Sequence, residues 1–118
     1  MARILVVDDN DDIRTMLRRL LERAGYDVAD THSADDALRS YREKPADLLI
    51  VDLLMPEKQG ITSIPEFLRE FPDVKIIAIS GAGREFLALA KKLGAQRAYT
   101  KPLELDELMQ GVKELLGD

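Results

Sequence analysis

The chain has no cysteine and only one histidine, and these absences narrow the kinds of site that it can build. Without cysteine there is neither a disulfide framework nor a thiolate metal site. The single histidine, His32, comes just before the serine of an expected helix start, so we expect it in a loop without a catalytic role. A metal site in this chain therefore has oxygen ligands.

The sequence also lacks a basic stripe, and its first residues lack the apolar stretch that a secretory signal requires. There are 17 basic and 22 acidic residues, which gives a net charge of −5. Such a chain is not expected to neutralise the charge of a phosphate backbone. We therefore expect a cytoplasmic protein that binds neither nucleic acid nor a membrane directly.

What the sequence does contain is enough apolar material for one core. Hydrophobic residues make up 46% of the 118 residues, and the length is close to the common domain size of about 100–150 residues. No linker or internal repeat divides the chain. The sequence thus predicts a single domain over residues 1–118, which ends just after its last predicted helix without an output domain.

Short apolar runs recur along the chain and are too short for helices. They are mostly β-branched or aliphatic, which is typical of buried strands. The runs are Ile4–Val7, Leu48–Val51, Ile76–Ile79 and the short Arg97–Thr100. A weaker alternating stretch from Tyr26 to Thr31 has no continuous apolar run, which favours a strand at the edge of a sheet.

Helical patterns lie between these runs. The clearest extends from Asp11 to Ala24, with apolar residues at three-and-four spacing and Gly25 as a stop. The other helices are expected from Ser33 to about Lys44, from a cap at Thr62 or Ser63 with Pro65 in the first turn, from Arg84 to Leu93, and from about Glu104 onwards. Gly111 lies inside the last of these and costs about 1 kcal/mol relative to alanine.

The alternation of five strands with five helices predicts the fold class. It requires parallel strands joined by right-handed crossovers, with helices covering both faces of the sheet. The sequence therefore predicts a doubly wound α/β domain.

Five polar residues stand at the carboxyl ends of the apolar runs. They are Asp8, Asp9, Asp52, Ser80 and Lys101. Open parallel sheets build their sites at this edge, so we expect these side chains to share one crevice. Three carboxylates there would repel one another unless a cation compensated them. Oxygen ligands favour Mg²⁺, with Mn²⁺ as the alternative.

These residue types also suit the transfer of a phosphoryl group to a carboxylate. Asp52 would attack phosphorus and become an acyl phosphate, which requires in-line positioning and charge neutralisation. An ion on Asp9 and Asp52 would hold one phosphoryl oxygen, while the Lys101 ammonium and the Ser80 hydroxyl would hold the other two. Asp8 is expected behind the ion, where it orients a water or accepts from Lys101.

The order and spacing of these motifs resemble a known family. The motifs are Val6-Val7-Asp8-Asp9, Val51-Asp52-Leu53-Leu54-Met55-Pro56 with Gly60, Ile79-Ser80-Gly81-Ala82 and Thr100-Lys101-Pro102. They span essentially the whole chain and are similar to those of response-regulator receiver domains of two-component signalling, such as chemotaxis regulators. The resemblance implies a flavodoxin-like parallel sheet of order 2-1-3-4-5.

The resemblance also implies a role for each site residue. Asp52 is the phospho-acceptor of a phosphoprotein, Asp8 and Asp9 form the acidic pair for Mg²⁺, and the backbone carbonyl of Leu54 adds a metal ligand. The Lys101–Pro102 peptide bond is implied to be cis, and an exposed part of helix one around Ile13 and Arg14 is a hypothetical contact for the phosphodonor, by analogy with the family.

The partners follow from the same resemblance. A sensor histidine kinase or a histidine phosphotransfer protein supplies the phosphoryl group, and the activated domain signals to a downstream protein or an output domain. Such a domain is not an ordinary enzyme, because it catalyses only its own phosphorylation and dephosphorylation.

One position departs from the family pattern. Receivers usually have an aromatic residue three positions before the lysine, and here that position is Ala98. Tyr99 follows it, and because side chains alternate across a strand, its ring is expected on the opposite face. The sequence therefore predicts a modified switch, in which a rearrangement around residues 81–83 replaces the usual coupling between Ser80 and an aromatic ring.

Two other function classes stay open on sequence alone. A phosphohydrolase of the haloacid-dehalogenase type would also form an aspartyl phosphate, but it normally has an acid two residues after its nucleophile, where this chain has Leu54. A phosphorylation-independent interaction module would be expected to have a damaged acidic pocket, whereas all three aspartates are present. The receiver interpretation is therefore preferred.

Overall fold

The computed structural model describes residues 2–53, 60–81 and 84–118, without the side chains of 60–62. In these ranges strands and helices alternate along the chain. The strands are β1 (Arg3–Val7), β2 (Asp27–Thr31), β3 (Leu48–Asp52), β4 (Lys75–Ser80) and β5 (Arg97–Thr100). The helices are α1 (Asp11–Arg23), α2 (Ala34–Glu43), α3 (Gly60–Glu70), α4 (Arg84–Leu93) and α5 (Leu105–Leu116).

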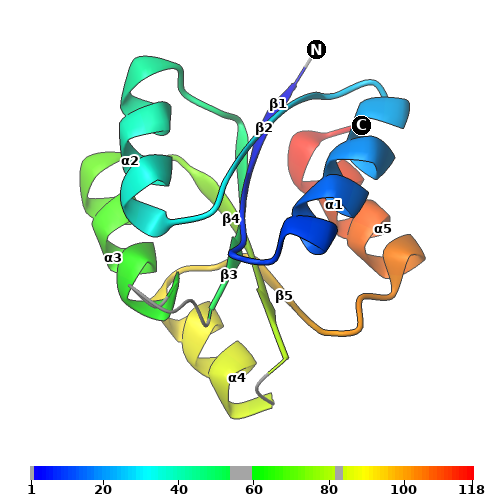
Figure 1. Ribbon diagram of the computed structural model, residues 1–118. Coiled ribbons are helices and arrows are strands. Elements are labelled where there is room, and N and C mark those ends of the chain that lie inside the picture. Colours follow the sequence, from blue (N-terminus) through cyan, green and yellow to red (C-terminus); the bar gives the residue numbers. More distant parts are fainter. Residues whose placement is uncertain (1, 54–59, 82–83) are drawn as a thin grey trace.

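The strands form one parallel sheet in the order β2-β1-β3-β4-β5 (Figure 1). The doubly wound α/β class and the strand order are therefore confirmed. β2 pairs with β1 at one edge of this sheet, which confirms the edge position predicted for Tyr26 to Thr31. Its alternating and partly polar sequence suits a strand with a single neighbour.

Helices cover both faces of the sheet, with α1 and α5 on one side and α2, α3 and α4 on the other (Figure 1). Successive strand residues point to opposite faces, so each strand contributes to two cores. In β3, for example, Leu49 and Val51 pack toward α2 and α3, whereas Leu48 and Ile50 pack toward α1 and α5. Because both faces are buried, the central strands are apolar throughout.

Both α1 and α2 begin after a capping residue, and the one at α2 is the serine predicted to start that helix. Asn10 precedes α1, and its side chain accepts a hydrogen bond from the Ile13 N–H at 3.1 Å. Ser33 precedes α2 and accepts from the Asp36 N–H at 3.2 Å. These contacts satisfy backbone donors that have no partner inside the helix.

The predicted start of α3 is wrong. The helix begins at Gly60, so Thr62 and Ser63 are helical positions and do not cap it, and Pro65 lies beyond the first turn. An interior proline costs about 3 kcal/mol. Ile64 and Phe67 of this helix are fully buried, and each contributes about 1.5–3 kcal/mol. Burial of the helix therefore offsets the cost of the proline.

Among the described residues, none of the helices combines the length and the apolar character that crossing a lipid bilayer requires.

Candidate functional site

Four strands end at the same edge of the sheet, and each places one of the predicted polar residues there. Asp52 is the last residue of β3 and Ser80 the last of β4, while Asp8 directly follows β1 and Lys101 directly follows β5. Asp9 lies one residue beyond Asp8. The structure therefore brings together residues that are up to 93 positions apart in the chain (101 − 8).

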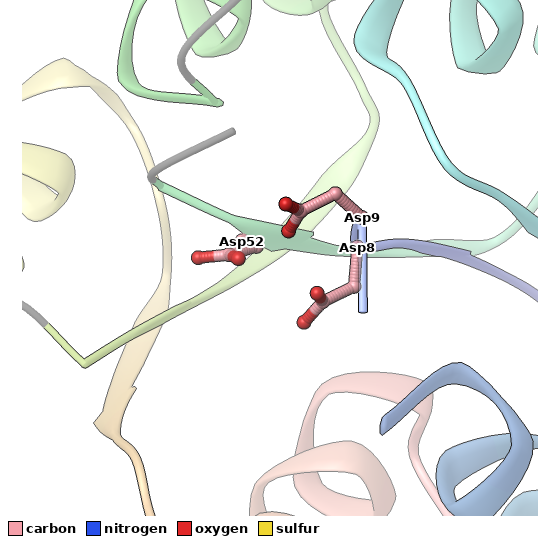
Figure 2. A group of neighbouring side chains, drawn as sticks. All are labelled: Asp8, Asp9 and Asp52. Atoms are coloured by element: carbon pink, nitrogen blue, oxygen red, sulfur yellow. The ribbon is translucent and has the colours of Figure 1, made fainter. Parts of the chain in front are cut away.

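The three aspartates form an acidic cluster. Asp8, Asp9 and Asp52 each offer a carboxylate oxygen, and these oxygens lie within 4.8 Å of one another. Figure 2 shows the carboxylates of Asp8 and Asp9 extending from the end of β1 to the side on which Asp52 lies. Asp8 and Asp52 are buried, whereas Asp9 is exposed. The cluster is therefore open to solvent on the side of Asp9.

Lys101 bridges the two buried carboxylates. Its Nζ lies 3.0 Å from Oδ2 of Asp8 and 3.1 Å from Oδ2 of Asp52. Burial on its own lowers the pKa of the Lys101 ammonium, but the hydrogen bond to Asp8 and the charge of Asp52 outweigh it, so the pKa is raised. The lysine is therefore charged and provides a fixed cation at the end of the sheet.

The backbone around Lys101 continues the strand pairing to the site. The Lys101–Pro102 peptide bond is cis, as the resemblance implied. The Lys101 N–H also donates to the Ser80 carbonyl at 2.8 Å, so the pairing of β4 and β5 continues to the site. Ser80 itself is fully buried.

The charges of the cluster fit a divalent cation. Three carboxylates and one ammonium leave a net charge of −2 on these four side chains (−3 + 1). Hard carboxylate oxygens are the ligands that Mg²⁺ and Mn²⁺ prefer. The donor set is therefore suitable for such an ion, and the further ligand predicted at the Leu54 carbonyl lies outside the described residues.

The two sides of β5 confirm the prediction for Tyr99. Ala98 packs with the core below α2, α3 and α4, whereas Tyr99 packs with the core below α1 and α5. The Tyr99 ring therefore lies on the opposite face of the sheet from Ala98. The rearrangement predicted around residues 81–83 stays a prediction, because residues 82 and 83 lie outside the described ranges.

Sequence reasoning missed the position of Arg14. We expected this residue on an exposed part of helix one, but its side chain is only 16% exposed, and its guanidinium donates to the Asp8 carbonyl at 2.6 Å. An arginine in the first turns of a helix that follows several aspartates is usually exposed to solvent. No local signal in the sequence therefore indicated this contact.

Comparison of the chain with known proteins agrees with this geometry. The family model described as the response regulator receiver domain matches residues 4–113. The chain belongs to this family. It is a receiver domain of a two-component system, and receiver domains are signalling modules whose family function is to accept a phosphoryl group.

Its relatives are both short and long proteins. The chain is 32% identical to the chemotaxis protein CheY of Thermotoga maritima, over 96% of each protein. It is 36% identical to the DNA-binding transcriptional regulator NtrC of Azospirillum brasilense, over 98% of this chain but 24% of that protein. The receiver domain thus spans nearly all of the first relative and about a quarter of the second.

Solved receiver structures have the same fold. The beryllofluoride-activated NtrC4 receiver domain dimer superposes with a TM-score of 0.92 at 28% identity, and 98% of this chain and 96% of that chain are covered. The response regulator TrrA of Thermotoga maritima, solved with Mg²⁺ and BeF, gives 0.89 at 33% identity over 98% and 99% of the two chains.

Proposed function

We propose that Asp52 accepts a phosphoryl group from the phosphohistidine of a sensor histidine kinase or a histidine phosphotransfer protein, with Mg²⁺ as the cofactor. The observation that supports it best is the bridge that Lys101 makes between Asp8 and Asp52 inside the acidic cluster. A buried carboxylate beside a fixed ammonium is suited to become an acyl phosphate, because the phosphoryl charge has a cation waiting for it.

Each residue of the site is proposed to have a part in the transfer. An oxygen of Asp52 forms the bond to phosphorus while the phosphorus–nitrogen bond of the donor breaks, and the imidazole leaves with the electron pair. Lys101 donates to one phosphoryl oxygen and the Ser80 hydroxyl to another. Lys101 stays paired with Asp8 during the transfer, so its charge remains in place.

The acidic residues would hold the ion. Asp9 and Asp52 are proposed as direct ligands of Mg²⁺, with Mn²⁺ as the alternative, and Asp8 as the residue that orients a bound water. When bound, the ion supplies positive charge that neutralises the phosphoryl oxygens. The acidic side chains fix the position of the ion and supply the negative charge that attracts it.

The phosphorylated domain is proposed to change conformation and to signal to a downstream protein or an output domain. The CheY relatives have nearly the length of this chain, and the NtrC relatives are about four times longer, so either kind of recipient agrees with the family. We further propose that the chain catalyses only its own phosphorylation and dephosphorylation, and that it acts in the cytoplasm.

Intact-mass spectrometry after incubation with acetyl phosphate and Mg²⁺ tests the transfer. We expect one added phosphoryl group on the parent and on Asp12→Asn, an exposed control aspartate of α1. We expect none on Asp52→Asn or in the presence of a chelator. An adduct that persists in Asp52→Asn would contradict the proposed acceptor.

Failure to form any adduct is resolved with beryllofluoride, which imitates the phosphoryl group without needing a donor. Amide chemical shifts that move at residues of the cluster in the parent but not in Asp52→Asn support the site. Shifts that move in neither protein would leave a phosphorylation-independent interaction module as the better explanation of the fold.

A further inference from the structure

Arg14 reaches back from α1 to the end of β1 and holds the backbone of the acidic pair. Its guanidinium donates to the Asp8 carbonyl at 2.6 Å, while the Asp8 N–H donates to the Thr31 carbonyl of β2 at 3.2 Å. A hydrogen bond from a charged donor is about twice as strong as a neutral one. The peptide that joins Asp8 to Asp9 is therefore fixed by an interaction outside the sheet.

The guanidinium is itself held in place by acidic side chains. It pairs with Asp11 of α1, and its Nε lies 3.9 Å from Oδ1 of Asp30 on β2. The other oxygen of Asp30 accepts from the Nε of Arg18 at 3.0 Å. Arg18 in turn donates to the Val28 carbonyl at 2.9 Å. Two turns of α1 are thus connected to the edge strand through Asp30.

The backbone matters most for Asp9. Among the described residues no hydrogen bond or ion pair holds the Asp9 side chain, whereas the Asp8 carboxylate accepts from the Asn10 N–H at 2.9 Å and pairs with Lys101. The direction of the Asp9 carboxylate therefore depends on the orientation of the peptide that precedes it. Mg²⁺ requires nearly ideal octahedral geometry, so a small error in that direction weakens binding.

We infer that Arg14 is a positioning residue of the metal site, which acts by orienting the Asp8–Asp9 peptide through the Asp8 carbonyl. The inference rests on the proposed function, because it needs Mg²⁺ to bind at the acidic cluster. A guanidinium is required, since its several donors engage the carbonyl and the acidic side chains at the same time. A lysine ammonium offers its donors from a single atom and holds the peptide less firmly.

The test compares Arg14→Met with Arg3→Met. Arg3 is 17% exposed, close to the 16% of Arg14, and it pairs with Asp27 at 3.1 Å across the same two strands, at their opposite end. The Kd of Mg²⁺ is measured by isothermal titration calorimetry, and the stability of the metal-free protein by urea unfolding. Removing residues behind a metal site typically weakens metal binding about 10–100-fold.

We expect both variants to lose stability in the metal-free state, but only Arg14→Met to raise the Kd of Mg²⁺, by about tenfold. Arg14→Lys is expected to lie between the parent and Arg14→Met, and it decides the question if the methionine variant does not fold. An unchanged Kd in the Arg14 variants, or an equal rise in Arg3→Met, would overturn the positioning role alone. A parent that binds no Mg²⁺ would overturn the proposed metal site together with this inference.

Discussion

At the scale of single residues, Lys101 lies between two buried carboxylates and compensates their charge. Replacing it with methionine leaves Asp8 and Asp52 without this cation. We expect Lys101→Met to lower the free energy of unfolding of the metal-free protein by about 3 kcal/mol, because breaking a buried ion pair strands a charge. This is the low end for a buried pair, since the Lys101 side chain is 21% exposed and solvent screens part of the interaction. Urea unfolding in the presence of a chelator measures this change.

The same variant should bind Mg²⁺ more tightly, because a competing positive charge has been removed. Lys91→Met, at an exposed position of α4, is the control and should change neither quantity. A Lys101→Met protein as stable as the parent would show that the aspartates do not depend on the ammonium.

Asp9 differs from its two neighbours in the cluster because it is exposed. We expect Asp9→Asn to fold as stably as the parent without metal, since no buried contact is lost and repulsion between carboxylates falls. Mg²⁺ should raise the melting temperature of the parent by binding to the folded state, and this rise should be absent from Asp9→Asn. Thermal unfolding with and without Mg²⁺ tests this, and an equal rise in both proteins would exclude Asp9 as a ligand.

Most residues of the site could be predicted because the topology of the sheet determines where they lie. In a parallel sheet the carboxyl ends of strands meet at one edge, so Asp8, Asp52, Ser80 and Lys101 could be grouped before any coordinates. Arg14 could not be placed in this way. Its partner, the Asp8 carbonyl, lies just after β1. The contact between them depends on how α1 packs, which no spacing in the sequence reports.

At the scale of secondary-structure elements, the packing of α5 on β5 explains Gly111. A Cβ atom built at Gly111 would lie 2.1 Å from the Tyr99 hydroxyl oxygen and 3.1 Å from Cζ of the same ring. The glycine therefore costs helix propensity but allows the ring to lie against α5. The aromatic residue that needs this space is Tyr99, which stands one position after the usual place in receiver domains.

Gly111→Ala should consequently destabilise the protein although alanine favours helices. Overpacking costs about 1–3 kcal/mol, whereas replacing glycine with alanine in a helix gains about 1 kcal/mol. The upper part of the overpacking range therefore outweighs the gain in helix propensity. In a Tyr99→Phe background the closest atom is absent, and the same substitution should cost less. Urea unfolding of the four proteins gives the coupling energy, and simple additivity would show that the two side chains do not interact.

α3 shows where local signals fail. Thr62 and Ser63 are residues that often cap helices, and Pro65 is tolerated in a first turn. The structure instead begins the helix at Gly60, since Ile64 and Phe67 gain more from burial than the proline costs. The boundaries of α1 and α2 were predictable because the capping residues agree with the apolar periodicity, whereas in α3 the two signals conflict.

At the scale of the whole molecule, the alternation of strands and helices predicted a doubly wound sheet but no strand order. The order 2-1-3-4-5 depends on which face each crossover helix covers, and it came only from the family resemblance. The two cores of the structure explain the outcome, because α1 and α5 share one face, and α2, α3 and α4 share the other.

These cores also bury Tyr26 and Tyr41 and partly bury Tyr99, and this predicts how stability depends on pH. Burial, with the hydrogen bond from Tyr26 to Asp118 at 2.7 Å, raises the pKa of Tyr26 from 10.0 to about 12. Burial also raises the pKa of Tyr41 and Tyr99. In the unfolded chain the three phenols lose their protons near the ordinary value of about 10.

The sign of the effect follows from the protons that each state holds. Below about pH 10 the phenols are protonated in both states, so they cause no pH dependence. Above it the unfolded chain has lost protons that the folded chain keeps, so the free energy of unfolding falls as pH rises toward 12. Lys101 acts in the same direction, because its raised pKa is also lost on unfolding.

Urea unfolding between about pH 9 and pH 11 should therefore show a fall of up to about 1.4 kcal/mol per pH unit for each tyrosine that keeps its proton. In this range Tyr26 should become tyrosinate only together with unfolding. Tyr26→Phe is the matched variant, since it removes one of these protons and the contact with Asp118. Its stability should be lower near neutral pH but should fall less steeply above pH 10, and parallel curves for the two proteins would show that Tyr26 titrates alike in the folded and unfolded states.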